Sequence, residues 1–393
     1  MPWYLWIVIV VGGFGSLGLL TALTMASITT ILAPRLARQR DVLPEGVPWP
    51  TLSVIVPSCN EEDTLEAALT TLLASDYPKM EIVLVNDRST DATGAIIERM
   101  ANADSRILPI HIDELPEGWL GKLHAMHRGT QQATGEFLLY SDADVHFEPS
   151  ALRRAIVWME RDRLGHLAII PRLVGRGLLY NATISCFAVF YLAAVKAWRI
   201  GKEGSESYGG VGAFSMVRRT DFDQSPGWEW LKMEVGDDVG LGMIMVREAG
   251  AKSILGIGPE LLQIDWYSSV GALVAGLEKN SYGAMCGYSM LRVAGAASML
   301  LGMLVGPFLA VLSPFPALWA LAGGVLSSLV VLALVFRRVG QPILASLCCP
   351  LGLAVLAGAL VRSAFTTERQ GGIRWRRQFY PLAELKAGRR VDL

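Results

Sequence analysis

Long stretches without a single charged residue constrain this chain more than any other feature of its sequence. Residues 1–34 carry no charge, and neither do residues 293–336 and 339–361. A helix needs about 20 apolar residues to cross the hydrocarbon core of a bilayer, and each stretch supplies that length. The sequence therefore predicts a multi-pass membrane protein, with a transmembrane anchor at residues 1–34 and a transmembrane region at residues 293–365.

Basic residues beside the first stretch predict its orientation. Arg35, Arg38 and Arg40 follow it within a basic, proline-rich linker at residues 35–50, and no basic residue precedes it. Because basic segments are retained on the cytoplasmic side, we expect the N-terminus outside and the polar middle of the chain inside. The expected location is the cell membrane, plasma or inner, with the polar part in the cytoplasm.

The sequence leaves the course of the later apolar stretches open. Three full crossings by residues 293–313, 317–336 and 343–361 would place the C-terminus outside. The arginines of the basic tail at residues 366–393 favour the inside instead. Pro307, which is followed by two further prolines, favours a re-entrant course for the first of these stretches.

The polar middle, residues 51–263, alternates between short apolar runs and helical periodicity. Apolar runs typical of strands lie at residues 52–57, 81–85, 106–110 and 136–140, and helical patterns at residues 66–74, 92–100 and 124–133. Ser89 or Asp91 is the expected cap of the second helix. Strands that alternate with helices predict a doubly wound, mostly parallel α/β sheet.

Polar side chains follow three of the expected strands where each strand ends. Asn60 and Glu61 follow the first strand, Asp87 ends the second, and Asp142 and Asp144 follow the fourth. Because ligands of such sheets bind at the carboxyl ends of the strands, we expect a site at this edge. No GxGxxG motif follows the first strand and no GxxxxGK[ST] motif is present, which argues against a dinucleotide site and a P-loop. No run of residues is suited to nucleic acid.

The pair Asp142 and Asp144 predicts a metal site. Two hard oxygen ligands suit Mg²⁺ or Mn²⁺, which keep several waters and bind through one or two carboxylates plus substrate phosphates. A DxD sequence also occurs as an ordinary loop or capping feature. Its position at the end of a buried strand, beside two other polar strand ends, favours the metal.

A second acidic group precedes an apolar helical stretch. "EVGDDVGLG" places Glu234, Asp237 and Asp238 at the start of that stretch, where acids complement the helix macrodipole. That role needs only one of the three. A carboxylate at a helix start near the metal is also suited to accept a proton from an incoming hydroxyl.

These motifs, taken together and in order, resemble those of the family-2 glycosyltransferases of GT-A fold. The resemblance covers residues 51 to about 255 and rests on "PSCNEE", "VLVNDRSTDAT", "GWLGK", "YSDADV" and "EVGDDVGLG". "GWLGK" and the tail sequence "GGIRWRRQFYPL" are similar to the membrane-anchored ceramide-glucosyltransferase-like and hopanoid-associated enzymes.

The resemblance implies roles for the matched residues. The nucleotide pocket would be shaped by Pro57, Asn60 and Glu61, with Asp87 on the uracil and Lys122 of "GWLGK" near the nucleotide-sugar. Asp142 and Asp144 would flank the ribose-diphosphate and bind the metal. Asp238 would be the catalytic base, with Asp237 beside it as the second catalytic candidate.

The implied reaction is inverting transfer of a sugar from a nucleotide-sugar donor, a UDP-sugar, to a hydroxyl of a membrane lipid. Processive relatives carry Gln-x-x-Arg-Trp shortly after the base, where this chain has "GLEKNSYG" with Lys279 and Asn280. Polymer synthesis is therefore not expected. Residues 370–375, "QGGIRW", carry one residue too many for that motif. We expect a basic tail flanking the membrane there; the alternative is that its arginines reach the acceptor or the diphosphate.

Two segments near the site are expected to lie along the bilayer. A crossing by residues 178–197 would separate Asp238 from Asp142, so we expect an interfacial helix there, and another at residues 264–292. Trp228, Trp230 and Trp266 fit either a sugar or lipid site or ordinary packing.

Two alternatives remain open. The acceptor could be a polyprenyl phosphate, which is already ionised and needs no strong base. The chain could instead be a catalytically silent scaffold or a component of lipid transport.

Overall fold

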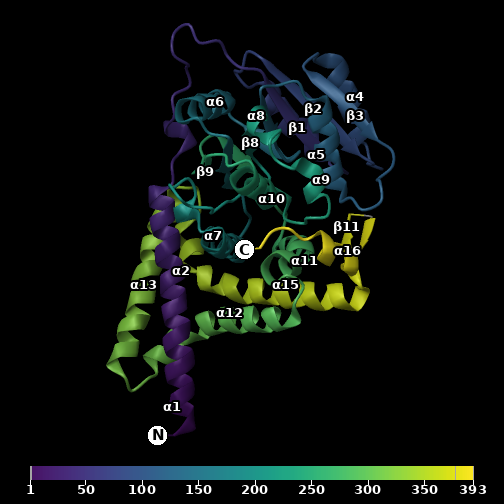
Figure 1. Cartoon of the computed structure of the whole chain (residues 1–393). Helices are drawn as coiled ribbons and strands as arrows, with labels where there is room; N and C mark the ends of the chain where they lie inside the picture. Colours follow the sequence, from purple (N-terminus) through teal and green to yellow (C-terminus); the bar gives the residue numbers. More distant parts are fainter. Residues whose placement is uncertain (1, 377, 393) are drawn as a thin grey trace.

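A seven-stranded sheet forms the centre of the polar part in the computed structural model, which describes residues 2–376 and 378–392. Its strand order is β3-β2-β1-β4-β8-β6-β9 (Figure 1). The strands are β1 (Leu52–Ser58), β2 (Met80–Asp87), β3 (Ile107–Ile112), β4 (Phe137–Tyr140), β6 (His166–Ile170), β8 (Ser215–Arg218) and β9 (Ser253–Ile257). Only β8 runs antiparallel to its neighbours, β4 and β6. The expected mostly parallel α/β sheet is confirmed, as a mixed sheet with one reversed strand.

The apolar runs form strands because both faces of the sheet are covered. In β1 and β2, side chains point alternately to two hydrophobic cores, one that contains Ile55 and Val83 and one that contains Val54 and Ile82. A sheet buried on both faces needs continuous apolar strands rather than alternating ones. Because burying a charged side chain is costly, the polar residues lie at the ends of the strands.

Helices cover these two faces. They are α3 (Leu65–Leu73), α4 (Thr93–Ala103), α5 (Gly121–Gln132), α6 (Ala151–Asp162), α8 (Arg219–Phe222), α9 (Gly227–Leu231) and α10 (Asp237–Met243). The predicted helices are confirmed to within a few residues. The N-cap residue of α4 is Ala92, one position after the predicted Asp91, although the Asp91 side chain does accept the Thr93 N–H. Helix α5 begins three residues earlier than predicted, which places Lys122 in its first turn.

Two small sheets complete the polar part. In the first, β10 (Leu262–Ile264) lies between β5 (Val145–Phe147) and β7 (Arg172–Leu173). The second is a hairpin of β11 (Gly372–Trp375) and β12 (Gln378–Pro381).

Among the described residues, four helices are long and apolar enough to cross a membrane. The first, Trp3–Leu32, joins α1 (Trp3–Ile7), a π-helical turn at Val8–Gly12 and α2 (Gly13–Leu32). The others are α12 (Met290–Val311), α13 (Pro316–Arg337) and α15 (Cys349–Gln370). Their length and composition agree with the predicted membrane regions.

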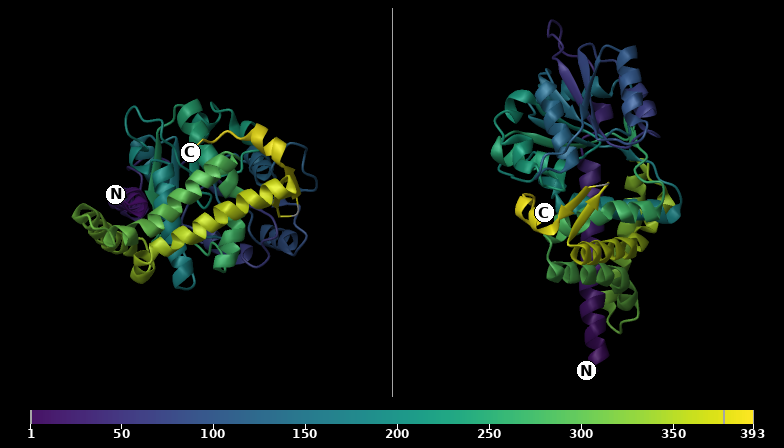
Figure 2. Two further views of the ribbon diagram at one scale, coloured as in Figure 1. Left: turned by 90° about the horizontal axis from the view of Figure 1, so that it is seen from below. Right: turned by 90° about the vertical axis from the view of Figure 1, so that its right-hand side faces the viewer.

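The four helices do not form a parallel bundle. α2 and α13 lie side by side, whereas α12 and α15 cross beneath the sheet at a steep angle to them (Figures 1 and 2). α12 crosses α2 at glycines: a Cβ added to Gly15 would lie 2.1 Å from the Gly302 carbonyl oxygen. Small residues at a crossing let two helix backbones approach closely, as is common in membranes.

Two shorter helices separate the sheet from the long helices. They are α7 (Leu178–Ala194) and α11 (Val270–Cys286), and both contact α15 (Figure 1). After α14 (Ile343–Leu347) and α15, the chain returns through β11, β12 and α16 (Leu382–Gly388) to the polar part. The C-terminal segment therefore lies on the same side of the long helices as the sheet.

Candidate active site

All of the predicted site residues line one cavity of about 1310 Å³. Its polar end lies at the carboxyl ends of β1, β2 and β4, which the parallel register aligns, with Ser58 opposite Asn86 and Ile55 opposite Tyr140. From these ends and from the starts of α5 and α10 come Pro57, Asn60, Glu61, Asp87, Lys122, Asp142, Asp144, Asp237 and Asp238.

The loops after β1 and β2 hold each other in place. Asn60, which has a positive φ of 55°, accepts the Thr90 N–H at 2.9 Å through its side-chain oxygen. Its own N–H donates to the Ser89 hydroxyl at 3.1 Å, and the Glu61 N–H donates to the Thr93 hydroxyl. The Asn60 amide oxygen is thus used to join the two loops that border this end of the cavity.

Asp87 is buried at the polar end of the cavity. It is only 5% exposed, and its carboxylate pairs with the guanidinium of Arg88, with an Nε to Oδ1 distance of 2.8 Å. A Cβ added to Gly121 would lie 2.4 Å from the Asp87 carboxylate, so a larger residue at the start of α5 would displace the Asp87 side chain.

Lys122 joins the two acidic motifs. Its ammonium lies 2.8 Å from Asp142 Oδ1 and 2.8 Å from Asp237 Oδ2. Burial acts to lower the pKa of Lys122, but the two carboxylates outweigh it and raise the pKa well above the usual range. The lysine is therefore charged, and its two ion pairs connect the DxD motif with the "EVGDD" motif.

The carboxyl group of Asp144 is well suited to a cation. Burial, followed by the negative charges of Asp142 and Glu61, raises the pKa of Asp144 to about 7. Within residues 2–376 and 378–392, however, no three His, Cys, Asp or Glu side chains converge as a ready metal site. Asp142 and Asp144 therefore fit an ion such as Mg²⁺ or Mn²⁺ only if donor phosphates and water complete its coordination.

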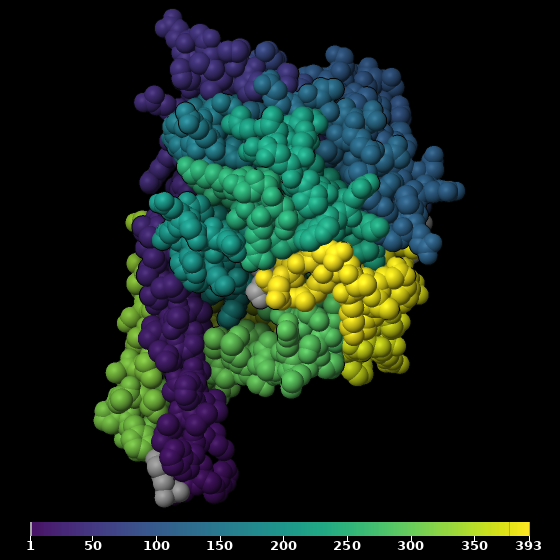
Figure 3. All heavy atoms as spheres, viewed as in Figure 1, coloured from purple at the N-terminus to yellow at the C-terminus, as the bar shows by residue number. Residues whose placement is uncertain are grey.

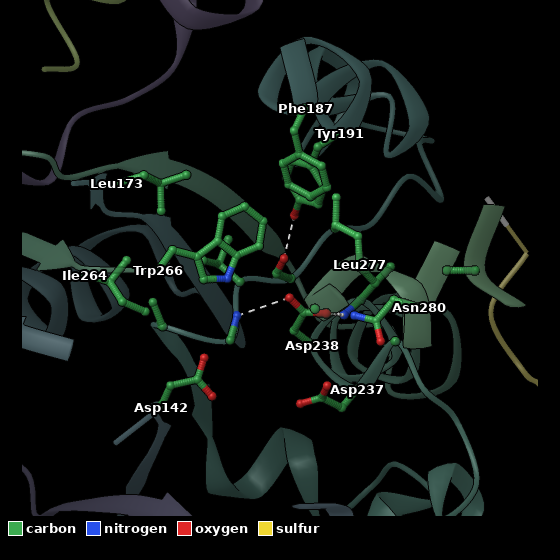
Figure 4. A pocket seen from close by; sticks show the side chains of 18 of the residues that line it. Asp142, Leu173, Phe187, Tyr191, Asp237, Asp238, Ile264, Trp266, Leu277 and Asn280 are labelled. Carbon is green, nitrogen blue, oxygen red and sulfur yellow. Dashed lines mark hydrogen bonds between the residues drawn. The ribbon is translucent and has the colours of Figure 1, made fainter. Parts of the chain in front are cut away.

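Asp238 occupies the first turn of α10 and faces the same space. One carboxylate oxygen accepts the Gly212 N–H at 3.1 Å and the other accepts the Val239 N–H at 2.8 Å (Figure 4). Burial, and then the neighbouring charge of Asp237, raises the pKa of Asp238 to about 7. A carboxylate with a pKa near the working pH is suited to general-base catalysis.

The opposite end of the cavity is apolar. Phe187 and Tyr191 of α7 stack with ring centroids 6.3 Å apart, and Phe187 lies 5.1 Å from Trp266 (Figure 4). Beyond these rings the lining continues to Leu32 at the end of α2 and Phe336 near the end of α13. The cavity thus joins the carboxylates to the ends of two candidate membrane helices.

Some lining residues had not been identified from the sequence. The loop before β8, "YGGVGAF", carries three glycines among residues 209–212, and that density of glycine was the available signal. A Cβ added to Gly210 would lie 1.7 Å from the Asp238 carbonyl oxygen, so the loop can pack against Asp238 only as glycine.

The tail follows the alternative in which its arginines reach the site. Arg374, Trp375, Arg376 and Tyr380 line the cavity instead of only flanking the membrane. Arg376 pairs with Glu61, and the ammonium of Lys279 lies 3.9 Å from the centre of the Trp375 ring. Burial, and then the charge of Lys122, lowers the pKa of Lys279 to about 8.

The three tryptophans singled out in the sequence have different places. Trp266 lines the cavity, whereas Trp228 is 2% exposed in the core. Trp230 lies under the guanidinium of Arg390.

Much of the polar part is similar in sequence to known proteins. Residues 53–224 match the family model described as "Glycosyl transferase family 2". A poly-beta-1,6-N-acetyl-D-glucosamine synthase from Staphylococcus epidermidis is 31% identical over 101 residues, which are 25% of this chain and 23% of that protein. A GalNAc(5)-diNAcBac-PP-undecaprenol beta-1,3-glucosyltransferase from Campylobacter jejuni is 32% identical over 103 residues, 26% of this chain and 32% of that protein. The chain thus spans about a quarter to a third of these relatives' length.

Among solved structures, the mannosyltransferase PcManGT from Pyrobaculum calidifontis, in complex with GDP-Man and Mn²⁺, is 18% identical to this chain. That alignment covers 90% of this chain and 99% of the other, with a TM-score of 0.49.

Proposed function

We propose that this chain, whose residues 53–224 form a glycosyl transferase family 2 domain, is an inverting, metal-dependent glycosyltransferase that uses a UDP-sugar and glycosylates a hydroxyl of a membrane lipid. Within that family we place it in the subgroup of ceramide-glucosyltransferase-like and hopanoid-associated enzymes. One observation carries the proposal. A single cavity joins six carboxylates at strand and helix ends to an apolar wall that reaches the membrane helices.

The polar end would hold the donor. Pro57, Asn60 and Glu61 would border the nucleotide and Asp87 would bind the uracil, while Lys122 and Asp142 would meet the diphosphate. A Mg²⁺ or Mn²⁺ ion held by Asp142 and Asp144 would offset the negative charge that develops on the departing diphosphate.

The chemical step needs one base. The acceptor oxygen forms a bond to the anomeric carbon while the bond from that carbon to the diphosphate oxygen breaks, and the hydroxyl proton passes to Asp238. One displacement inverts the anomeric configuration, through a transition state similar to that of glycoside hydrolysis. With a pKa of about 7, the Asp238 carboxyl is substantially ionised at neutral pH and able to take that proton.

The apolar end would hold the acceptor. A lipid hydroxyl at Asp238 would leave its hydrocarbon chain against Phe187 and Trp266 and toward the membrane helices. The absence of Gln-x-x-Arg-Trp after the base supports a single transfer rather than polymer synthesis. Since the positive residues after the first helix favour the cytoplasm, both the sheet and the C-terminal segment would lie on the cytoplasmic face of the cell membrane.

The test follows from this division of the cavity. The purified full chain, in detergent with Mn²⁺ and a bacterial lipid extract, should release UDP from a UDP-sugar and label a lipid. Ala188→Trp, which fills the apolar end at α7, should lower lipid labelling at least tenfold while UDP binding stays unchanged. The matched control is Ala294→Trp on α12, where the alanine is exposed and outside the cavity lining.

Equal lipid labelling by the two variants would contradict the proposal that the acceptor binds at the apolar end. Absence of UDP release with every UDP-sugar supplied would contradict the proposed function itself.

A further inference from the structure

A buried carboxylate outside the reacting group holds the end of the chain. Glu234 accepts the Arg390 N–H at 2.7 Å and the Val391 N–H at 2.8 Å through one oxygen, and the Gly236 N–H at 3.0 Å through the other. Glu234 is only 4% exposed, so these bonds are shielded from water. Hydrogen bonds to an ionised acceptor are about twice as strong as neutral ones.

The segment that Glu234 holds is also well packed. Val391 is 2% exposed in the core, and the Tyr208 hydroxyl donates to the Asp392 carbonyl oxygen at 3.2 Å. A Cβ added to Gly388 would lie 2.2 Å from Met233 Cβ, so only glycine allows this approach. We call residues 388–392, together with Glu234, the C-terminal clasp.

Upstream of the clasp, the same tail contacts the donor end of the cavity. The Tyr380 hydroxyl accepts the N–H of Gly121, the residue before Lys122, at 3.1 Å, and Arg376 pairs with Glu61. In Figure 3 the yellow atoms of the tail lie directly below the polar part of the molecule. One segment therefore contacts the residue before Lys122 and, through Glu234, the loop before Asp237.

The loop between Glu234 and Asp237 depends on such contacts. Glu234 does not belong to α10, which begins only at Asp237 and has just seven residues. The loop contains Gly236, which brings no side chain of its own to anchor it. α10 itself continues into a π-helical turn at Ile244–Glu248 and is held in the core by buried side chains such as Leu241 and Ile244. The loop at Gly236 has no such anchor, so contacts from neighbouring segments help to set where Asp237 and Asp238 lie.

We propose that Glu234 is a positioning residue: by holding residues 390 and 391, it fixes the loop that places Asp237 against Lys122 and Asp238 at the acceptor hydroxyl. The inference rests on the proposed function for its effect on turnover. The clasp itself is a contact within the chain and can be measured without any substrate.

The first experiment replaces the acceptor of the three N–H groups. Glu234→Gln keeps the size of the side chain but turns an –NH₂ donor toward N–H donors. We expect kcat to fall about ten- to a hundredfold, UDP affinity to stay within about twofold, and the amides of residues 390 and 391 to exchange hydrogen faster. Glu229→Gln is the matched control, because the Glu229 side chain is 75% exposed and should leave all three measurements unchanged.

A second pair of variants acts from the other side of the contact. Arg390→Pro removes the N–H that donates to Glu234, and the preceding Arg389, at φ −66° and ψ 129°, already has the extended conformation that a following proline requires. Arg390→Ala keeps the N–H but removes the guanidinium from the Trp230 ring, 5.2 Å away. We expect Arg390→Pro to reproduce the loss in kcat and Arg390→Ala to retain most of the activity.

Two results would overturn the proposal. In the first, residues 390 and 391 lose protection in Glu234→Gln while kcat per folded molecule is unchanged, which leaves the clasp a purely structural role. In the second, Arg390→Ala is as inactive as Arg390→Pro, so the N–H is not what matters.

Failure of the proposed function would look different. The wild type would release no UDP, and hydrogen exchange would then decide the positioning claim alone. Faster exchange of the Asp237 and Asp238 amides in Glu234→Gln supports it, and unchanged exchange contradicts it.

Discussion

The two ends of the cavity are built in opposite ways. The donor end consists of short motifs that directly follow β1, β2 and β4, and neighbouring loops hold it together through bonds such as Thr90 N–H to Asn60. The proposed acceptor end is assembled from α2, α7, α11 and α13, which lie far apart in the sequence. A charged site needs partners placed to within a few tenths of an ångström, whereas an apolar wall needs only suitable volume, which any helix can supply.

The largest expected effect comes from removing the metal from the donor end. EDTA should abolish turnover, and Asp144→Asn should severely weaken use of the nucleotide-sugar, because Asp142 alone would then be left to hold the ion. The measurement is UDP release with and without added Mn²⁺. Since Asp142 and Asp144 lie at the polar end of the cavity, lipid binding at the apolar end should be unaffected. Full activity in EDTA would contradict the metal role.

Asp238 lies where the two ends meet. Its replacement should lower the activity less than loss of the metal does, but more than any change in the apolar wall. General-base help is worth about 10²–10⁴-fold in rate, so Asp238→Asn should lower kcat by that factor while UDP affinity, measured by calorimetry, survives. Asp237→Asn is the matched variant. Near-normal kcat in Asp238→Asn with an inactive Asp237→Asn would move the base to Asp237. A much smaller loss in Asp238→Asn would favour a polyprenyl phosphate acceptor, which is already ionised.

The pH dependence gives a second measurement of the same base. Burial and the charge of Asp237 raise the pKa of Asp238 to about 7, so the group is protonated and inactive below that pH. Wild-type kcat should therefore rise as the pH increases through about 7. Asp238→Asn should lose this rise, and a rise that persists in the variant would place the titrating group elsewhere.

The smallest expected effect comes from replacing Lys122 at the donor end. Lys122 pairs with Asp142 and Asp237 at 2.8 Å each, so Lys122→Met leaves two neighbouring carboxylates without their cation. We expect Mn²⁺ to bind about tenfold more tightly in the absence of donor, and UDP to bind more weakly. Titration of free Mn²⁺ by electron paramagnetic resonance measures the first effect, with the exposed Lys252→Met as the control. Unchanged or weaker binding of Mn²⁺ would show that Lys122 does not compete with the ion.

Local sequence patterns determined the sheet, its helices and the polar strand ends. A strand buried on both faces must be apolar throughout, and the carboxyl ends of parallel strands must meet at one edge, so the positions of Asp87, Asp142 and Asp144 followed from short segments. Charge-free stretches longer than about 20 residues likewise determined the candidate membrane helices, because the thickness of a bilayer sets that length.

Only the tertiary structure decided how distant segments meet. The reversal of β8, the steep crossing of α12 over α2 at Gly302, and the return of the tail to Glu61 and Glu234 have no local pattern that predicts them. Glu234 and Arg376 appear in the sequence as an acid before a helix and a base beside a membrane. Their partners lie 156 and 315 positions away in the chain, and contacts over such separations depend on the packing of the whole molecule rather than on neighbouring residues.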